Sequence, residues 1–287
     1  MPSILKQYGG LDIVWIKARE IEELSKNIRK IIDGQDIDLR VSQEGVWNIL
    51  KNDIHILAKL KNEQVSVLQH DRDVLKDTLA DISHQLKTPL TSMMIMIDLL
   101  EDAPPEKQAE FIQHIQIGLQ RTEWLVSALL KMAKLEADAV IFSREPVYAS
   151  TLIEQASEPL QIQLELKQQT IRVTGEAELH CDRRWTVEAL SNIIKNASEH
   201  SPDDSEIQIE SGANPICTWI SVTDSGQGLE LAQIAKLFRR FEGSESNTGY
   251  GIGLPLALAI MRGQGGDIEV TGGGRGQGAS FALKLFR

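Results

Sequence analysis

The stretch DVLKDTLADISHQLKTPLTSMMIMIDLL, residues 73–100, decides the fold of the first half of the chain. Apolar residues recur in it every three or four positions, which is the spacing of one face of a long α-helix. The same period starts earlier, so we expect this helix over about 62–101, and a shorter helical run before it. An apolar seam of this kind packs in a coiled coil or a helix bundle. Its members are Leu68, Leu75, Leu79, Ile82, Leu86, Leu90, Met93 and Ile97.

A second amphipathic helix follows the turn that Pro104 and Pro105 predict, and it ends near Asp138. Two such helices joined by a short turn form an antiparallel hairpin. In a single hairpin each helix has only one neighbour, and much of both seams stays uncovered. Pairing two hairpins into a four-helix bundle covers both seams, so we expect a homodimer through the hairpin.

The pattern of apolar residues changes after about residue 142, where short β-like runs alternate with helical ones. This pattern predicts an α+β domain with a mixed sheet packed on helices. The fold class is therefore N-terminal helices, a helical hairpin and an α/β sandwich, with domains over 1–61, 62–140 and 141–287. The expected strands are 170–175, 206–211, 216–224, 267–272 and 279–286, and the expected helices are 183–199 and 253–263.

Composition limits the classes of function. The net charge of −11 argues against binding to nucleic acid or to an anionic membrane, because both favour a basic surface. The two cysteines, Cys181 and Cys217, lack metal-ligand spacing and indicate a reducing compartment. No apolar run approaches the roughly 20 residues of a membrane span, and the N-terminus lacks a signal peptide. We expect a cytoplasmic chain, with an upstream membrane anchor left open.

The run WTVEALSNIIKNASEH, residues 185–200, carries a polar stripe on a helix. Glu188, Asn192 and Asn196 are four residues apart and share one face. Asparagine is a poor residue in the middle of a helix, so two of them one turn apart need a reason. One interpretation is a solvated polar face. The other is that an amide oxygen supplies a hard ligand for Mg²⁺, with phosphates completing the octahedron.

Two glycine-containing motifs follow. Asp224-Ser225-Gly226-Gln227-Gly228 ends a β-like run, and its carboxylate is suited to accept a hydrogen bond from the amino group of a base. Gly249-Tyr250-Gly251-Ile252-Gly253-Leu254 precedes a helix, where backbone N–H groups can converge on an anion. By itself the second motif also fits a dinucleotide fingerprint, but residues 239–248 before it are not a buried strand, which argues against a Rossmann unit.

In their order along the chain, these elements resemble the ATP-binding domain shared by sensor histidine kinases, Hsp90-type chaperones, MutL-type repair proteins and gyrase-type topoisomerases. The order is the Asn-bearing helix, D-x-G-x-G, the segment LFRRF at 237–241, and G-x-G-x-G-L. The run at 263–286 also resembles the ending of histidine kinases of bacterial two-component systems. The resemblance covers about residues 65–286 and implies ATP and Mg²⁺.

The resemblance assigns roles to individual residues. Asn196 would coordinate Mg²⁺ with Asn192 beside it, and Asp224 would bind the adenine amino group. Residues from Phe238 to about Thr248 would form a mobile lid over ATP. The other implied nucleotide-binding residues are Gly226 and Gly228 beside the base, Arg240 in the lid segment, and Gly249, Gly251, Gly253 and Leu254 along the triphosphate.

The family's phosphoacceptor motif is H-[E/D]-x-x-T-P, and DISHQLKTPL fits it except at Gln85. His84 lies two residues from Ile82 and two from Leu86, about 200° around the helix from each, so it points outward. An ordinary surface histidine is the alternative. The resemblance implies that His84 takes the γ-phosphoryl group and passes it to an aspartate of a response regulator. Thr88, one turn along the same face, would orient water for dephosphorylating that regulator.

Four residues depart from the family pattern. Gln85 replaces a carboxylate, Glu199 replaces a phosphate-binding lysine, Gly243 replaces a lid arginine, and Gln264 replaces a histidine. They leave open a nucleotide-binding scaffold without catalysis, or a homologue in which the phosphatase activity dominates. A chaperone or repair clamp of the same superfamily is a third reading, which the His84 motif argues against. Residues 1–61 loosely resemble a HAMP-like signal relay.

Overall fold

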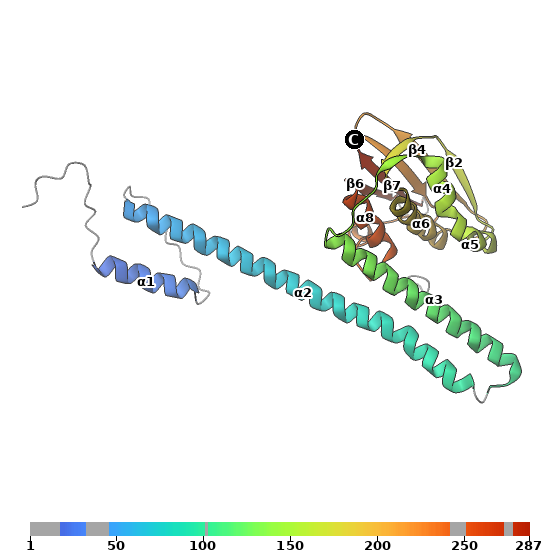
Figure 1. The fold of residues 1–287 in the computed structure, drawn as a ribbon, viewed down its shortest axis with the longest axis horizontal. Coiled ribbons are helices and arrows are strands. Elements are labelled where there is room, and N and C mark those ends of the chain that lie inside the picture. The colour runs from blue at the N-terminus through green and yellow to red at the C-terminus, as the bar shows by residue number, and fades with distance from the viewer. Residues whose placement is uncertain (1–17, 33–45, 101–102, 242–250, 273–277) are drawn as a thin grey trace, which may run out of the picture. The chain divides into compact units, whose positions relative to one another are not determined.

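A computed structural model describes residues 18–32, 46–100, 103–241, 251–272 and 278–287 (Figure 1). The chain divides into two compact units, residues 1–80 and 81–287. Within the described residues, none of the helices combines the length and the apolar character needed to cross a bilayer.

In the first unit, α1 (Ala18–Ile32) packs against the early part of α2 (Val46–Leu100). Leu24 is buried, with Ile28, Ile54 and Ala58 packed around it. The helix α2 contains neither Gly nor Pro before Pro89, and this explains why one helix covers both the shorter run and the seam that we expected to start near 62. The domain boundary predicted at 61–62 falls inside this helix and stays a prediction.

In the second unit, the end of α2 and α3 (Pro105–Glu136) form the predicted hairpin. Pro105 takes the first position of α3, where its missing N–H costs no helical hydrogen bond. Met93 is 5% exposed and faces Gly118, at which an added Cβ would lie 2.8 Å from the Met93 Cγ. Many other apolar side chains of the hairpin are exposed in the single chain, among them Leu90, Ile97, Ile112, Leu119, Val126 and Leu130.

The α/β domain is built on a mixed five-stranded sheet. The strand order is β2-β4-β5-β7-β6; β2 and β4 are parallel and the other pairs antiparallel. All five strands predicted from the sequence are present. A separate pair, β1 with β3, was missed because each strand has only four residues. The bounds are β1 Glu145–Tyr148, β2 Thr170–Thr174, β3 Glu178–Cys181, β4 Glu206–Ala213, β5 Cys217–Thr223, β6 Gly266–Gly272 and β7 Ala279–Phe286.

Helices α6 and α8 contact the sheet, and α4 packs against α6 (Figure 1). The core between these layers includes Leu190, Ile209 and Phe281, all fully buried or nearly so. Leu125 and Met132 of α3 belong to the same apolar cluster, so this hairpin helix shares a core with the α/β domain. The helix bounds are α4 Ala149–Ser157, α5 Gln161–Leu166, α6 Arg183–His200, α7 Leu231–Ile234 and α8 Gly253–Gly263, with a 3₁₀ turn at Glu158–Leu160.

Gln264, one of the departures from the family pattern, has a structural role. Its side chain is buried just after α8, where Oε1 accepts from the backbone N–H of Asp182 at 2.6 Å. Its Nε2 donates to the Thr186 Oγ1 at 3.2 Å. These two bonds join the end of α8 to the start of α6. Removing the amide would leave a buried N–H without its acceptor.

We therefore expect Gln264→Ala to lower the free energy of unfolding by about 2 kcal/mol, the cost of an unsatisfied buried polar group and a lost hydrogen bond. Urea unfolding followed by circular dichroism measures the change. The matched control is Gln161→Ala, because Gln161 is exposed at the start of α5. Equal midpoints for the two variants would contradict this role.

Candidate functional site

The candidate phosphoacceptor lies on the exposed side of α2, as its spacing predicts. His84 and Thr88 are both exposed, whereas Gln85 is half-buried and Leu86 packs toward the core. The Thr88 Oγ1 donates to the backbone carbonyl of His84 at 3.1 Å. Pro89 has no N–H to give to the carbonyl of Gln85, one turn earlier. The His84 face is thus open to a partner and carries accessible polar groups.

Helix α6 positions the asparagine stripe. Asp182 caps its first turn, since the Oδ1 accepts from the backbone N–H groups of Arg184 and Trp185 at 3.1 and 3.2 Å. The inward face of α6 is buried against the sheet and includes Leu190, Ile193, Ile194 and Ala197. Asn192 and Asn196 occupy the other face and are half-buried.

The last turn of α6 is held by two side chains. Gln169 donates from Nε2 to the carbonyls of Ser198, Ser201 and Pro202 at 3.0–3.2 Å. Lys167 donates from Nζ to the carbonyls of Ser198 and Ser201 at 2.7 and 3.2 Å. A cation at a helix C-terminus also opposes the negative end of the helix dipole. The hydrogen bonds of Gln169 and Lys167 thus fix the C-terminal end of α6, which carries the polar stripe.

Asp224 is fixed by backbone groups at the end of β5. Its side chain is 6% exposed, and Oδ1 accepts from the N–H groups of Gly226 and Ala279 at 2.8 and 3.1 Å. Both bonds use the same carboxylate oxygen, which leaves Oδ2 for a donor on a ligand. Gly226 is required here for space, because a Cβ would lie 2.6 Å from the carbonyl oxygen of His200.

The start of α8 closes the cleft opposite α6. A Cβ placed on Gly253 would lie 3.1 Å from the Asn192 Oδ1, so the glycine keeps space open between the two helices. Gly253 and Leu254 are the first residues of α8, whose leading N–H groups have no helical acceptor. These groups and the positive end of the helix dipole favour an anion at this place.

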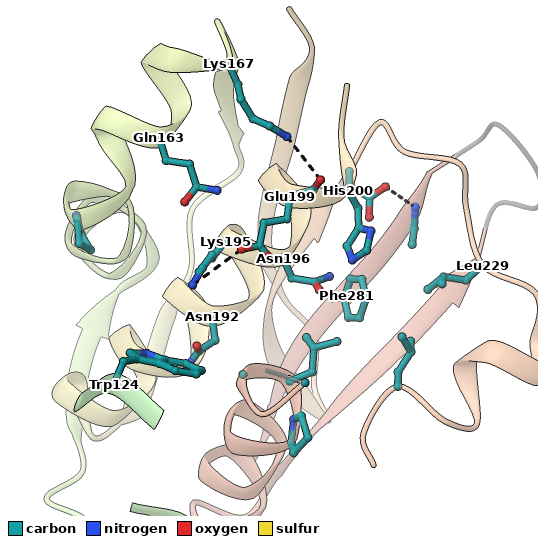
Figure 2. Close-up of a pocket in the computed structure, with 18 of the residues that line it drawn as sticks. Trp124, Gln163, Lys167, Asn192, Lys195, Asn196, Glu199, His200, Leu229 and Phe281 are labelled. Atoms are coloured by element: carbon teal, nitrogen blue, oxygen red, sulfur yellow. Dashed lines mark hydrogen bonds and ion pairs between the residues drawn. The ribbon is translucent and has the colours of Figure 1, made fainter. Parts of the chain in front are cut away.

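These elements surround a single cleft of about 1410 Å³ (Figure 2). It is large enough for a nucleoside triphosphate. Figure 2 shows Asn192 and Asn196 on one wall, with Leu229 and Phe281 on the other side of the opening. Of the residues predicted from the sequence, the cleft brings together Asn192, Asn196, Asp224, Gly228, Gly251, Gly253 and Leu254.

Other predicted residues lie elsewhere. Gly226 does not line the cleft; its backbone N–H donates to the Asp224 Oδ1. Phe238 packs on the core, while its neighbour Leu237 lines the cleft. Arg240 is ion-paired with Glu136 at the end of α3, outside the lining, and burial lowers the pKa of its guanidinium. Gly249, Gly243 and the predicted lid beyond Phe241 fall outside the described residues.

Sequence reasoning missed several residues of the cleft. Lys195 follows Asn192 by three positions on α6, and this spacing was the available signal. The others come from distant segments, and nothing in their local sequence marks them. They include Arg121 and Trp124 of α3, Gln163 and Lys167 near α5, and Leu229 and Phe281 beside the predicted base site.

Glu199 lies inside a basic cluster. Burial raises the pKa of its carboxyl, while the nearby basic groups of Lys195, His200, Lys167 and Arg121 act in the opposite direction. Its Oε1 lies 3.9 Å from the Lys195 Nζ. The carboxyl that stands in place of the family's phosphate-binding lysine is therefore surrounded by basic side chains from α6, the α5 end and α3.

The donor set of the cleft fits Mg²⁺. No group of three His, Cys, Asp or Glu side chains able to hold a metal occurs among the described residues. Mg²⁺ usually takes only one or two protein ligands and completes its shell with water and substrate phosphates. Asn196, and Asn192 beside it, line the cleft near the N-terminus of α8 and would be the residues to hold the ion through their amide oxygens.

Two family models match the chain. The His Kinase A (phospho-acceptor) domain matches residues 74–138, which include His84 and α3. The histidine kinase-, DNA gyrase B- and HSP90-like ATPase model matches residues 181–287, which include the whole cleft side formed by α6, Asp224 and α8. Together with the hairpin and the mixed-sheet domain, these matches show that the chain belongs to the sensor histidine kinases of two-component systems.

Individual relatives agree with this family. The sensor histidine kinase YclK of Bacillus subtilis (strain 168) is 26% identical over 278 residues, 93% of this chain and 58% of YclK. The crystal structure of full-length ShkA in complex with AMPPNP is 25% identical with a TM-score of 0.55, over 73% of this chain and 46% of ShkA. The chain thus spans about half the length of these relatives.

A further neighbour shows the fold. The histidine kinase ThkA, solved in complex with the response regulator protein TrrA, has a TM-score of 0.62 at 20% identity. The alignment covers 79% of this chain and 66% of ThkA. The order of hairpin and α/β domain is therefore shared at low sequence identity.

The half-buried carboxyl of Glu199 predicts a pH-dependent stability. Because its pKa is raised by burial, the stability that it contributes is complete below the pKa of the unfolded chain and is lost as pH rises through the folded value. We expect Glu199→Gln to melt at a higher temperature than the wild type at about pH 8, with a smaller difference at about pH 4. Thermal unfolding across this range measures it.

The control is Glu165→Gln, an exposed carboxyl on α5 outside the cleft. A melting-temperature difference for Glu199→Gln that stays constant with pH, or that grows in acid, would contradict the effect of burial.

Proposed function

We propose that this chain is the kinase portion of a sensor histidine kinase, which transfers the γ-phosphoryl group of ATP to His84. The observation that carries the proposal is the convergence in one cleft of Asp224, Asn196 and the N-terminus of α8. A chain with this cleft also carries an exposed histidine in the T-P context of a phospho-acceptor domain. The bound AMPPNP of ShkA supports ATP as the phosphoryl donor.

The cleft has a place for each part of ATP. The Asp224 Oδ2 accepts from the adenine amino group, and Leu229 supplies apolar surface for the base. The triphosphate then runs toward Gly253, where the first N–H groups of α8 donate hydrogen bonds to its oxygens. Mg²⁺ held by Asn196 would neutralise charge on the phosphates. Binding therefore depends on groups that are already in place.

Phosphoryl transfer forms one bond and breaks another. A ring nitrogen of neutral His84 attacks the γ-phosphorus, and the bond from that phosphorus to the bridging oxygen breaks as ADP leaves. The proton on the other ring nitrogen is then released. Gln85 can accept a hydrogen bond from that N–H and hold the ring, but it cannot take the proton. We infer a slow but competent phosphoacceptor.

The phosphoryl group would next pass to an aspartate of a response regulator that docks on the hairpin. His84 and Thr88 are exposed on the same face of α2, as this step requires. The Thr88 hydroxyl donates to the His84 carbonyl, which leaves its oxygen to accept from a water molecule. This position suits a second, phosphatase activity toward the regulator.

We also propose that the kinase is a homodimer. The hairpin in a single chain leaves large apolar side chains such as Leu90, Ile97 and Leu119 exposed. Burying them in a four-helix bundle would remove this surface from water. A membrane anchor upstream of the chain is a further part of the proposal; the chain covers 58% and 48% of two curated relatives, so these proteins contain segments beyond the matched region.

A second candidate is a dimer that binds nucleotide and holds a regulator without phosphorylating it. Two observations favour it: Gln85 stands where a base is usual, and Arg240 is paired with Glu136 instead of lining the cleft. Nucleotide binding without a phosphohistidine would select this candidate.

The main test is incubation of the chain with γ-labelled ATP and Mg²⁺. We expect acid-labile, alkali-stable label that is lost in His84→Ala, because the nucleophile is gone. The matched control is His114→Ala, an exposed histidine on α3, which should keep the label. Asp224→Asn should lose both labelling and nucleotide binding, since an amide loses the charge that holds the adenine amino group. Label retained by His84→Ala would reject the site.

A second prediction concerns the departure at Gln85. We expect Gln85→Glu to raise the initial rate of autophosphorylation about ten-fold, because a carboxylate can take the proton that the amide cannot. The affinity for nucleotide should not change, since Gln85 lies on the hairpin outside the cleft. An unchanged or lower rate would reject this account of Gln85.

A further inference from the structure

Lys195 stands between the nucleotide cleft and the hairpin. Together with Asn192, Asn196 and Glu199 it occupies one face of α6, at spacings of three, four and seven residues, and all four line the cleft. Its Nζ lies 5.2 Å from the ring centroid of Trp124 on α3. Figure 2 shows Lys195, Asn192 and Trp124 next to one another on the same side of the cleft.

The contacts of Lys195 are weak ones. A cation over an aromatic ring at a partly exposed site changes an equilibrium only about two- to five-fold. The ion pair with Glu199 is 3.9 Å long, which exceeds the length of a hydrogen bond. The side chain is 37% exposed. A phosphate oxygen would offer the ammonium a short, charge-assisted hydrogen bond, which is stronger than either contact.

Two other lysines close to α6 are already engaged. Lys167 donates to the carbonyls at the end of α6, and Lys131 is hydrogen-bonded to Glu188. Both hold structural elements together, so withdrawing either would cost hydrogen bonds. Lys195, in contrast, lies beside both asparagines, and its two weak contacts can be exchanged for a stronger one.

We propose that Lys195 binds the triphosphate of the nucleotide, in place of the lysine that the family carries at the position of Glu199, and that Trp124 competes for the same ammonium. This inference rests on the proposed nucleotide-binding function. Because Trp124 belongs to the hairpin and Lys195 to the α/β domain, nucleotide weakens one contact between them. By linkage, that contact weakens nucleotide binding by the same factor.

The test is calorimetric titration with Mg²⁺–AMPPNP and with AMP, which lacks the β- and γ-phosphates. Lys195→Ala should weaken AMPPNP binding about ten-fold or more, the loss of one charged hydrogen bond, and leave AMP binding unchanged. Lys195→Arg should retain most of the affinity. The control Lys134→Ala makes the same change of charge on an exposed part of α3 outside the cleft.

Competition is tested with Trp124→Leu. This change should tighten AMPPNP binding about two- to five-fold, the equivalent of one exposed cation–π contact. In the Lys195→Ala background the same change should have no effect, and a double-mutant cycle measures the coupling. Thermal unfolding of each variant verifies that it is folded.

The possible failures are distinct. If the wild type does not bind AMPPNP, the proposed function fails and the inference fails with it. If the wild type binds and folded Lys195→Ala binds equally well, or loses AMP affinity to the same extent, only the role of Lys195 is overturned. If Trp124→Leu weakens AMPPNP binding, or acts equally in both backgrounds, the competition is overturned.

Discussion

The site depends on the helical period of α6. One face of this helix must be buried for the α/β domain to have a core, and Leu190, Ile193 and Ile194 meet that requirement. The 3.6-residue repeat then places residues 192, 195, 196 and 199 together on the remaining face. The hydrogen bonds of Asp182 and Gln169 at the two ends of α6 hold that face toward the cleft. The same burial that stabilises the domain orients its polar stripe.

The cleft is completed by backbone, and this limits which residues can line it. Asp224 is fixed by N–H groups of Gly226 and Ala279, and Gly253 keeps α8 clear of Asn192. These contacts need close approach of main chains and need no particular large side chain. The motif glycines are therefore needed for the close approach of main chains, although they have no side chain to offer a ligand.

The departures from the family pattern have different physical consequences. Gln264 forms two hydrogen bonds that join α8 to α6, so the fold accommodates it fully. Glu199 is surrounded by basic groups, which reduces its repulsion of phosphate. The ammonium group of Lys195 lies on the same face of α6. Gln85 can hold the ring of His84 through a hydrogen bond but cannot take its proton. The weakest point of the proposed chemistry is therefore proton removal at His84.

The sequence alone determined the hairpin, the five main strands, both long helices of the α/β domain and the polar stripe, because each of these follows from local periodicity. It also placed His84 on an exposed face, since its angle to Ile82 and Leu86 is set by the helix. The tertiary structure alone decided that Trp124 and Arg121 line the cleft and that Arg240 pairs with Glu136. In each case a residue of α3 contacts residues that lie far away in the chain, and only packing of α3 against the α/β domain brings them together.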